Sequence, residues 1–304
     1  MKDTIYYRQA ELLLKVLPIV DAEGIFALKG GTAINFFVRD LPRLSVDIDL
    51  AYIPIGERNE SLQHITVSLN NISLKILKMF PNARIAKMTI GDTSNLRGMV
   101  VSVNGVTIKI EPNIVMRGTV YEPKNFELSQ KAQEFFELYV SVKSLTSSEL
   151  YASKICAALD RQHPRDLFDI YLLLKNEKIG EKMRRAFIIY LICHPRPMVE
   201  LLYPNLKDIS ENYEKEFKGM TIDEILLEDL LEARDSLIST IKNTLTRSEK
   251  DFLLSVKKGN PDWSIMEMEG IESLPAVKWK LLNIGRMDKA KHHIAIEKLE
   301  KYLE

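Results

Sequence analysis

The pattern of apolar and polar residues predicts helices near the beginning of the chain. In residues 1–20, leucine and valine side chains recur at helical spacing, as expected for an amphipathic helix. Residues 61–80 show the same kind of pattern. Between these two segments, residues 32–38 predict a shorter helix that begins after a pair of glycines and ends at Leu41-Pro42.

Short apolar or alternating runs predict strands in the same part of the chain. Two runs, at residues 25–28 and 46–52, lie on either side of the short helix. Three β-rich runs follow at residues 85–90, 99–103 and 106–115, and Asn104-Gly105 between the last two is a strong hairpin signal. A last strand is expected at residues 138–142. The mixture of helices and strands indicates an α+β domain.

The pattern changes to a purely helical one from Ser147 onward. Residues 213–245 are charged and strongly periodic, which is typical of exposed helices on a bundle. We therefore expect two domains: an α+β domain over residues 1–145 and a helical domain over residues 146–304.

Charge and cysteine content narrow the functional classes. The 304 residues include 42 basic and 42 acidic side chains, so no overall charge favours nucleic acid or a membrane, although local basic patches remain compatible with the total. Cys156 and Cys193 lie in apolar helical stretches without paired metal ligands and are expected to be free thiols. With no signal-peptide pattern and no apolar run long enough to span a membrane, the sequence predicts a soluble cytoplasmic protein.

An Asp-x-Asp pair stands in the run at residues 46–52. Successive strand residues alternate faces, so Asp47 and Asp49 project from the same side. Two carboxylates on one face repel each other unless a positive charge lies between them. Mg²⁺, or Mn²⁺ in its place, prefers oxygen ligands of this kind, so the pair is a candidate metal and catalytic site.

Gly30 and Gly31 precede the short helix and add a second candidate element. Glycines permit a tight turn in which backbone N–H groups come close to a ligand, and a helix N-terminus favours phosphate oxygens. Thr32 follows directly and offers a hydroxyl donor. The three residues are therefore candidates for nucleotide binding.

Glu111 ends the alternating strand over residues 106–111. If that strand pairs beside the Asp-x-Asp strand, Glu111 becomes a third metal ligand for Asp47 and Asp49. Two metal ions would then bind the attacking and leaving oxygens of an in-line displacement. Glu111 is also a candidate for deprotonating the incoming hydroxyl.

A further cluster lies in the predicted helical domain. Lys154 shares a helical face with apolar residues, so its amine is expected to point inward and to bind a triphosphate. Asp166 and Asp169 lie three apart on the next predicted helix, which begins near Pro164. An ordinary acid near a helix N-terminus is the alternative for Asp166, and a surface lysine is the alternative for Lys154.

Four stretches in this order resemble the AbiEii/AbiGii-type nucleotidyltransferase toxins of bacterial toxin–antitoxin and abortive-infection systems. The stretches are LKGGTAINFF, LPRLSVDIDL, TIKIEPN and ELYASKICAALDRQHPRDLFDIYLLL, with a weaker echo in LPAVKWKLLNIGRM. These toxins belong to the DNA polymerase β-like nucleotidyltransferase superfamily. The family pattern often has serine in the glycine motif, where this chain has Gly31 and Thr32.

The resemblance implies a mixed sheet with flanking helices, followed by a helical C-terminal domain. It implies Asp47 and Asp49 as metal ligands, and it matches Lys154 and Asp166 to a later lysine and aspartate linked to nucleotide handling and catalysis. The implied reaction transfers a nucleotide from an NTP, with the 3′ end of tRNA as the expected acceptor and a cognate antitoxin as the expected partner.

Several alternatives remain open at the level of sequence. The acceptor can instead be a protein or small-molecule hydroxyl, or the chain can be a catalytically degenerate binding partner. A sugar-nucleotide transferase also uses Asp-x-Asp, but the glycine pair and the Glu111 strand argue against it. The Arg286–His292 spacing occurs in some helical ribonucleases, although a basic solvated helix explains it more simply.

Three further positions have two interpretations each. Arg43 and Ser45 lie just before the Asp-x-Asp strand, where they either contact phosphate or belong to a solvated loop. Trp279, between two lysines, either stacks on RNA or, as we expect, is a half-buried anchor for the C-terminal helices. Basic segments at residues 182–185 and 278–291 are the candidate phosphate-binding patches.

Overall fold

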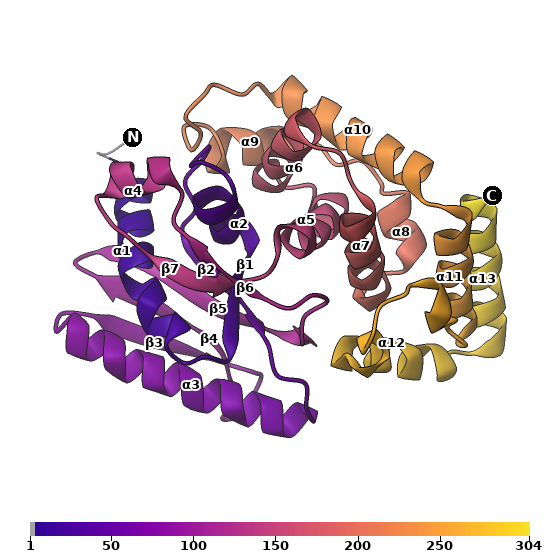
Figure 1. The fold of residues 1–304 in the computed structure, drawn as a ribbon, viewed down its shortest axis with the longest axis horizontal. Coiled ribbons are helices and arrows are strands. Elements are labelled where there is room, and N and C mark those ends of the chain that lie inside the picture. The colour runs from indigo at the N-terminus through magenta and orange to yellow at the C-terminus, as the bar shows by residue number, and fades with distance from the viewer. Residues whose placement is uncertain (1–3) are drawn as a thin grey trace. The chain divides into compact units, whose positions relative to one another are not determined.

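The computed structural model describes residues 4–304 and divides into two compact units (Figure 1). The α+β unit extends to Leu150 and includes Gly219–Glu224. The helical unit comprises Tyr151–Lys218 and Ile225–Glu304. The boundary falls inside one helix, α5 (Ser147–Arg161). No helix in residues 4–304 combines the length and the apolar character needed to cross a membrane.

A seven-stranded mixed sheet forms the centre of the α+β unit, counted over residues 4–304, with strand order β3-β4-β5-β2-β1-β7-β6. The parallel pairs are β2–β5 and β1–β7, and the remaining neighbours are antiparallel. The strands are β1 (Phe26–Lys29), β2 (Asp47–Tyr52), β3 (Arg84–Thr89), β4 (Leu96–Val103), β5 (Val106–Arg117), β6 (Lys124–Glu127) and β7 (Ser141–Ser144).

Helices α1 (Ile5–Asp21) and α3 (Arg58–Met79) contact each other and the sheet (Figure 1). Both place an apolar stripe inward, as their helical periodicity predicts. The prediction for residues 1–20 covers three residues, 1–3, that lie outside the described part of the chain. A short helix, α2 (Gly30–Ala33), continues into a π-helical turn over Ile34–Val38.

The hairpin at Asn104-Gly105 connects β4 and β5 as predicted. Both residues have positive φ, 49° for Asn104 and 80° for Gly105, which a two-residue turn of this kind requires. The last strand differs from its prediction at residues 138–142, because β7 begins only at Ser141. Helix α4 (Gln130–Phe136) and the edge strand β6 precede it. β6 has only four residues, nearly all exposed, so it carries no apolar alternation that a sequence pattern could show.

One segment of the mainly helical part of the chain pairs within the α+β unit. Thr221 forms an antiparallel bridge with Arg43, and the Leu44 N–H donates to the Met220 carbonyl. The Ile222 N–H donates to the Pro42 carbonyl. These bonds hold the loop that leads into β2, so its backbone polar groups are satisfied although Arg43 and Leu44 are buried.

The helical unit is built around α7 (Glu181–Cys193), which is buried on almost every side and therefore shows little amphipathic contrast. α7 contacts α11 and α12, and α6 contacts α10. Two short 3₁₀ turns lie at Trp263–Ile265 and Ile271–Ser273. Besides α5 and α7, the helices are α6 (Pro164–Asn176), α8 (Met198–Leu202), α9 (Ser210–Glu216), α10 (Leu227–Thr244), α11 (Arg247–Lys258), α12 (Pro275–Gly285) and α13 (Lys289–Leu303).

Candidate active site

Strand register brings two acids and a lysine into one row across the sheet. β2 pairs in parallel with β5 so that Asp49 lies opposite Glu111, and β2 pairs with β1 so that Asp49 also lies opposite Lys29. Directly opposite residues project from the same face of a sheet. The pairing of β2 with β5, on which the role of Glu111 depends, is therefore present in the structure.

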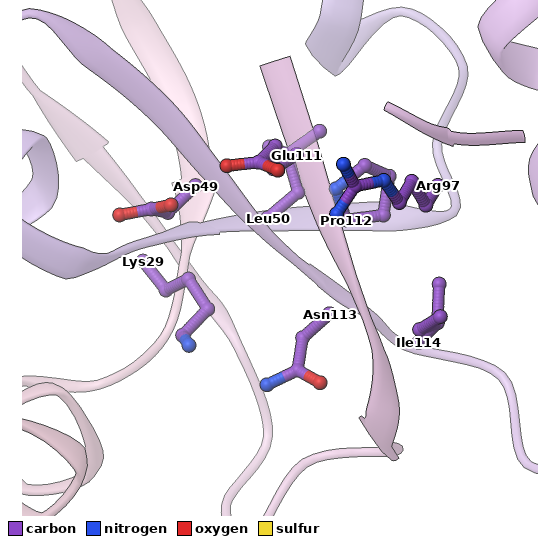
Figure 2. Close-up of a pocket in the computed structure, with 8 residues that line it drawn as sticks. All are labelled: Lys29, Asp49, Leu50, Arg97, Glu111, Pro112, Asn113 and Ile114. Atoms are coloured by element: carbon purple, nitrogen blue, oxygen red, sulfur yellow. The ribbon is translucent and has the colours of Figure 1, made fainter. Parts of the chain in front are cut away.

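A pocket of about 290 Å³ opens at this row. Figure 2 shows the carboxylates of Asp49 and Glu111 beside each other, with Lys29 and Asn113 on one side and Arg97 beyond Glu111. The pocket therefore combines two acidic groups with two cationic ones, and the remaining lining residues are Leu50, Pro112 and Ile114.

Asp47 lies two residues before Asp49 on the same strand, opposite Lys109. Alternation gives it the same face as Asp49, but it does not line the pocket. Lys109 Nζ lies 2.6 Å from Glu111 Oε2. The structure thus brings Asp49 and Glu111 into one pocket and leaves Asp47 at its margin.

Gly30 is required by the position of Asp49. Its φ is +74°, and a Cβ added there would collide with the Asp49 carboxylate. Gly31 is also closely packed, since an added Cβ would lie 2.7 Å from a terminal guanidinium nitrogen of Arg43. The glycine pair therefore allows the turn to approach the Asp-x-Asp strand and the loop before it.

Thr32 fastens this turn to β2. Its hydroxyl donates to the Asp47 carbonyl at 2.6 Å and lies 3.0 Å from Ser45 Oγ. The Thr32 side chain is buried, so the structure uses its hydroxyl within the protein. Of the two alternatives for Arg43 and Ser45, the solvated loop is wrong, because both side chains are buried beneath the glycine turn.

The acids in the pocket fit a Mg²⁺ ion that arrives with a triphosphate. Within residues 4–304, no group of three or more His, Cys, Asp or Glu side chains is arranged to hold a metal ion. Mg²⁺ is usually bound through one or two carboxylates together with substrate phosphates. Asp49 and Glu111 would supply two carboxylates, and oxygens of the substrate phosphates would supply further ligands.

Lys154 is held inside the helical unit by two aspartates. Its Nζ lies 2.8 Å from Asp166 Oδ1 and 3.0 Å from Asp169 Oδ2, and its side chain is only 6% exposed. Arg161, at the end of α5, also pairs with Asp166. Lys154 is thus neither a surface lysine nor an isolated cation, because it joins α5 to α6 through a buried ion-pair cluster.

The cluster shifts the pKa of Asp166. Burial alone raises the pKa of this carboxyl, but the charges and hydrogen bonds of Lys154 and Arg161 outweigh burial and hold it well below its usual range. Asp166 is therefore an acceptor at neutral pH. The two cysteines are free thiols, as predicted, and burial raises the pKa of Cys193 to about 12.

Sequence reasoning missed three polar residues of the pocket: Lys29, Arg97 and Asn113. Lys29 adjoins Gly30, so its position beside the glycine motif was a usable signal. Asn113 lies two residues after Glu111 on β5, so strand alternation was a usable signal for it. Arg97 was missed because β4 begins at Leu96, before the run predicted at residues 99–103.

The comparisons with known proteins point to one family of nucleotidyltransferases. A family model described as nucleotidyl transferase AbiEii toxin, type IV toxin–antitoxin system, matches residues 11–281. Among solved structures, the chain is similar to MenT4, a nucleotidyltransferase toxin from Mycobacterium tuberculosis H37Rv, with a TM-score of 0.59 and 12% identity over 92% of this chain and 93% of that one. No curated protein matches the chain.

Proposed function

Because this chain belongs to the AbiEii family of nucleotidyltransferase toxins, we propose that it transfers a nucleoside monophosphate from an NTP to the 3′ end of tRNA in the cytoplasm, with Mg²⁺ or Mn²⁺ as cofactor. The observation that carries the proposal is the register of β2 with β5, which sets Asp49 opposite Glu111. In the proposed role, Asp49 and Glu111 hold the metal together with phosphate oxygens of the NTP, and Asp47, which does not line the pocket, adds negative charge on the same face of β2.

The charged residues of the pocket have defined parts in the proposed reaction. The acceptor hydroxyl oxygen attacks the α-phosphorus, its bond to that phosphorus forms, and the bond to the bridging oxygen breaks to release pyrophosphate. The metal, when bound, neutralises charge on the phosphates. Glu111 accepts the hydroxyl proton, directly or through water. Lys29 and Arg97 contact phosphate oxygens from the two sides of the carboxylate pair.

The glycine turn and the buried lysine cluster complete the proposal. Gly30 and Gly31, positioned by Thr32, present backbone N–H groups to the triphosphate. Lys154 and Asp166 handle the nucleotide, a role that rests on the family resemblance. Most of the catalytic effect would come from positioning and charge stabilisation.

The test is to incubate the purified chain with each labelled NTP, Mg²⁺ or Mn²⁺, and deacylated tRNA or total bacterial protein. We expect label at the tRNA 3′ end and none without divalent metal. Label in protein but none in tRNA, across all four NTPs, would refute the RNA acceptor and leave the nucleotidyltransferase intact.

Asp49→Ala is expected to lower transfer by at least about a hundredfold, since it removes one of two pocket carboxylates. Its fold should remain, because the strand is anchored by the buried neighbours Ile48 and Leu50. Circular dichroism and thermal melting provide the control. A folded Asp49→Ala protein with wild-type turnover would disprove the metal-binding role.

A further inference from the structure

The two basic segments of the helical unit have different surroundings. Arg184 pairs with Glu249 at 2.7 Å, and Arg185 pairs with Glu181 and Glu267 at 2.7 Å and 2.8 Å. These two arginines of residues 182–185 are therefore neutralised within the protein, and the segment is poorly suited to bind phosphate.

The second segment, residues 278–291, keeps its cations exposed. Of the residues that the structure describes, none forms an ion pair with Lys278, Arg286, Lys289 or Lys291, and all four are exposed. Asp288 is the one acid of the segment, and it caps α13 by accepting the Lys291 N–H. The segment therefore presents an uncompensated positive charge.

Lys280 differs from these four cations. Its Nζ donates to the His194 and Arg196 carbonyls, and burial lowers its pKa. The side of α12 that carries Lys280 is buried, and its apolar residues are Ala276, Val277 and Ile284. Lys280 thus helps to orient the helix, so that the opposite side faces solvent.

That exposed side carries Trp279 and Leu282, which are 57% and 44% exposed. They lie three residues apart, and Arg286 follows Leu282 by four, so the three share one face of the helix end. The expectation that Trp279 is a half-buried anchor is wrong. The other tryptophan, Trp263, packs on Phe252 with ring centroids 5.4 Å apart, whereas no aromatic ring of residues 4–304 packs on Trp279.

We infer that the α12 surface, defined as Lys278, Trp279, Leu282 and Arg286, binds a single-stranded segment of the RNA acceptor. Trp279 stacks on an unpaired base, and the cations contact the flanking phosphates. An exposed aromatic ring among unpaired cations is the combination that single-stranded nucleic acid requires. A protein partner would be better served by a larger apolar patch. This inference deepens the proposed function and rests on it for the identity of the acceptor.

The test measures RNA binding without NTP, so that it does not depend on transfer. A fluorescently labelled 12-nucleotide single-stranded RNA is titrated with the full chain and followed by anisotropy. Trp279→Ala should weaken binding about tenfold, since stacking of one base contributes this order of affinity. Trp279→Phe should recover most of the loss because it keeps an aromatic face.

Matched variants separate stacking and phosphate contact from general effects. Tyr139 is another exposed aromatic residue, and Lys178 is another exposed lysine, so Tyr139→Ala and Lys178→Gln should bind RNA as the wild type does. Arg286→Gln should lower the slope of log affinity against log salt concentration by the contribution of about one phosphate contact. In a Trp263→Phe background all tryptophan emission comes from Trp279, and RNA should quench it.

Three outcomes would overturn the inference: unchanged affinity of Trp279→Ala, equal affinity of the wild type for double-stranded RNA, or equal displacement of the RNA by poly-glutamate of the same charge. The last would show a surface that recognises charge alone, as an acidic protein partner would. RNA binding that depends on Trp279 without transfer to any RNA would support the surface and disprove the proposed acceptor chemistry. Transfer to tRNA, together with unchanged RNA binding by Trp279→Ala, would support the proposed acceptor chemistry and disprove the role of the α12 surface.

Discussion

Gly30 is constrained both by its backbone conformation and by its neighbour. A side chain at its φ of +74° is strained, and the same Cβ would displace the Asp49 carboxylate. The chain offers a natural comparison in Gly24, which has nearly the same φ, +73°, but no atom within 4 Å of an added Cβ. The two positions separate backbone strain from damage to the pocket.

Gly30→Ala is therefore expected to lower transfer by at least about a hundredfold, whereas Gly24→Ala should retain activity. Both should lose about 1–2 kcal/mol of unfolding free energy to backbone strain, and Gly30→Ala should lose more because Asp49 must move. Denaturant unfolding and NTP-labelling assays on the two variants check this. Equal activity of the two would show that the contact with Asp49 is unimportant.

At the scale of elements, the ion-pair cluster is a buried polar connection between α5 and α6. Two buried carboxylates, Asp166 and Asp169, share one buried lysine. Burying such charges is costly unless each keeps its partner. The cluster therefore affects the stability of the helical unit in addition to any role in nucleotide handling.

Lys154→Ala should lower the free energy of unfolding by about 3–5 kcal/mol, since it leaves buried carboxylates without their shared cation. Lys175→Ala, at an exposed position on α6, is the matched control and should change stability little. Calorimetry with a non-hydrolysable NTP analogue and Mg²⁺, on folded protein, tests the proposed nucleotide role separately. Unchanged affinity would assign Lys154 a purely structural function.

The depressed pKa of Asp166 predicts a loss of stability in acid. Because the folded-state pKa lies below the unfolded value of 3.8, the unfolded chain binds a proton first as the pH falls. The stabilisation is complete above about pH 5 and declines progressively below pH 4. The unfolding free energy, measured by urea denaturation at several pH values between pH 6 and pH 2, should fall less steeply with decreasing pH for Asp166→Asn than for the wild type. An identical pH dependence of the two proteins would contradict the assignment.

At the scale of the whole molecule, a balanced charge total conceals local segregation. The 42 basic and 42 acidic residues cancel, yet residues 278–291 contain five cations and one acid. Any attraction to RNA must therefore come from a local patch, such as this segment, and not from the net charge of the molecule as a whole. Such binding weakens as salt rises, because released counterions contribute to it.

Expression of the chain in bacteria without its antitoxin is expected to slow growth, since tRNA with an added 3′ nucleotide cannot be aminoacylated normally. Cells that express the Asp49→Ala variant should grow like cells that carry the empty vector. Growth rates and tRNA 3′-end sequencing from the same cultures connect the phenotype to the proposed acceptor. Growth arrest with unmodified tRNA 3′ ends would show that the toxin acts on another acceptor.

Local patterns in the sequence were sufficient for most of the individual elements. The alternation at Asp47, Ile48 and Asp49 predicts a strand with one acidic face, and Asn104-Gly105 predicts its hairpin, because both depend only on residues near each other in the chain. The short edge strand β6 was missed, since exposure removes the apolar signal. The family resemblance, which rests on ordered motifs, added the fold class.

Only the tertiary structure decided which distant residues meet. The parallel register of β2 with β5 placed Glu111 beside Asp49. The pairing of β4 with β5 added Arg97 to the same pocket. Folding also buried Arg43, paired Lys154 with two aspartates and left Trp279 in solvent. Burial and pairing depend on the surfaces that pack together, and a residue's spacing along the chain carries no information about a surface formed by another segment.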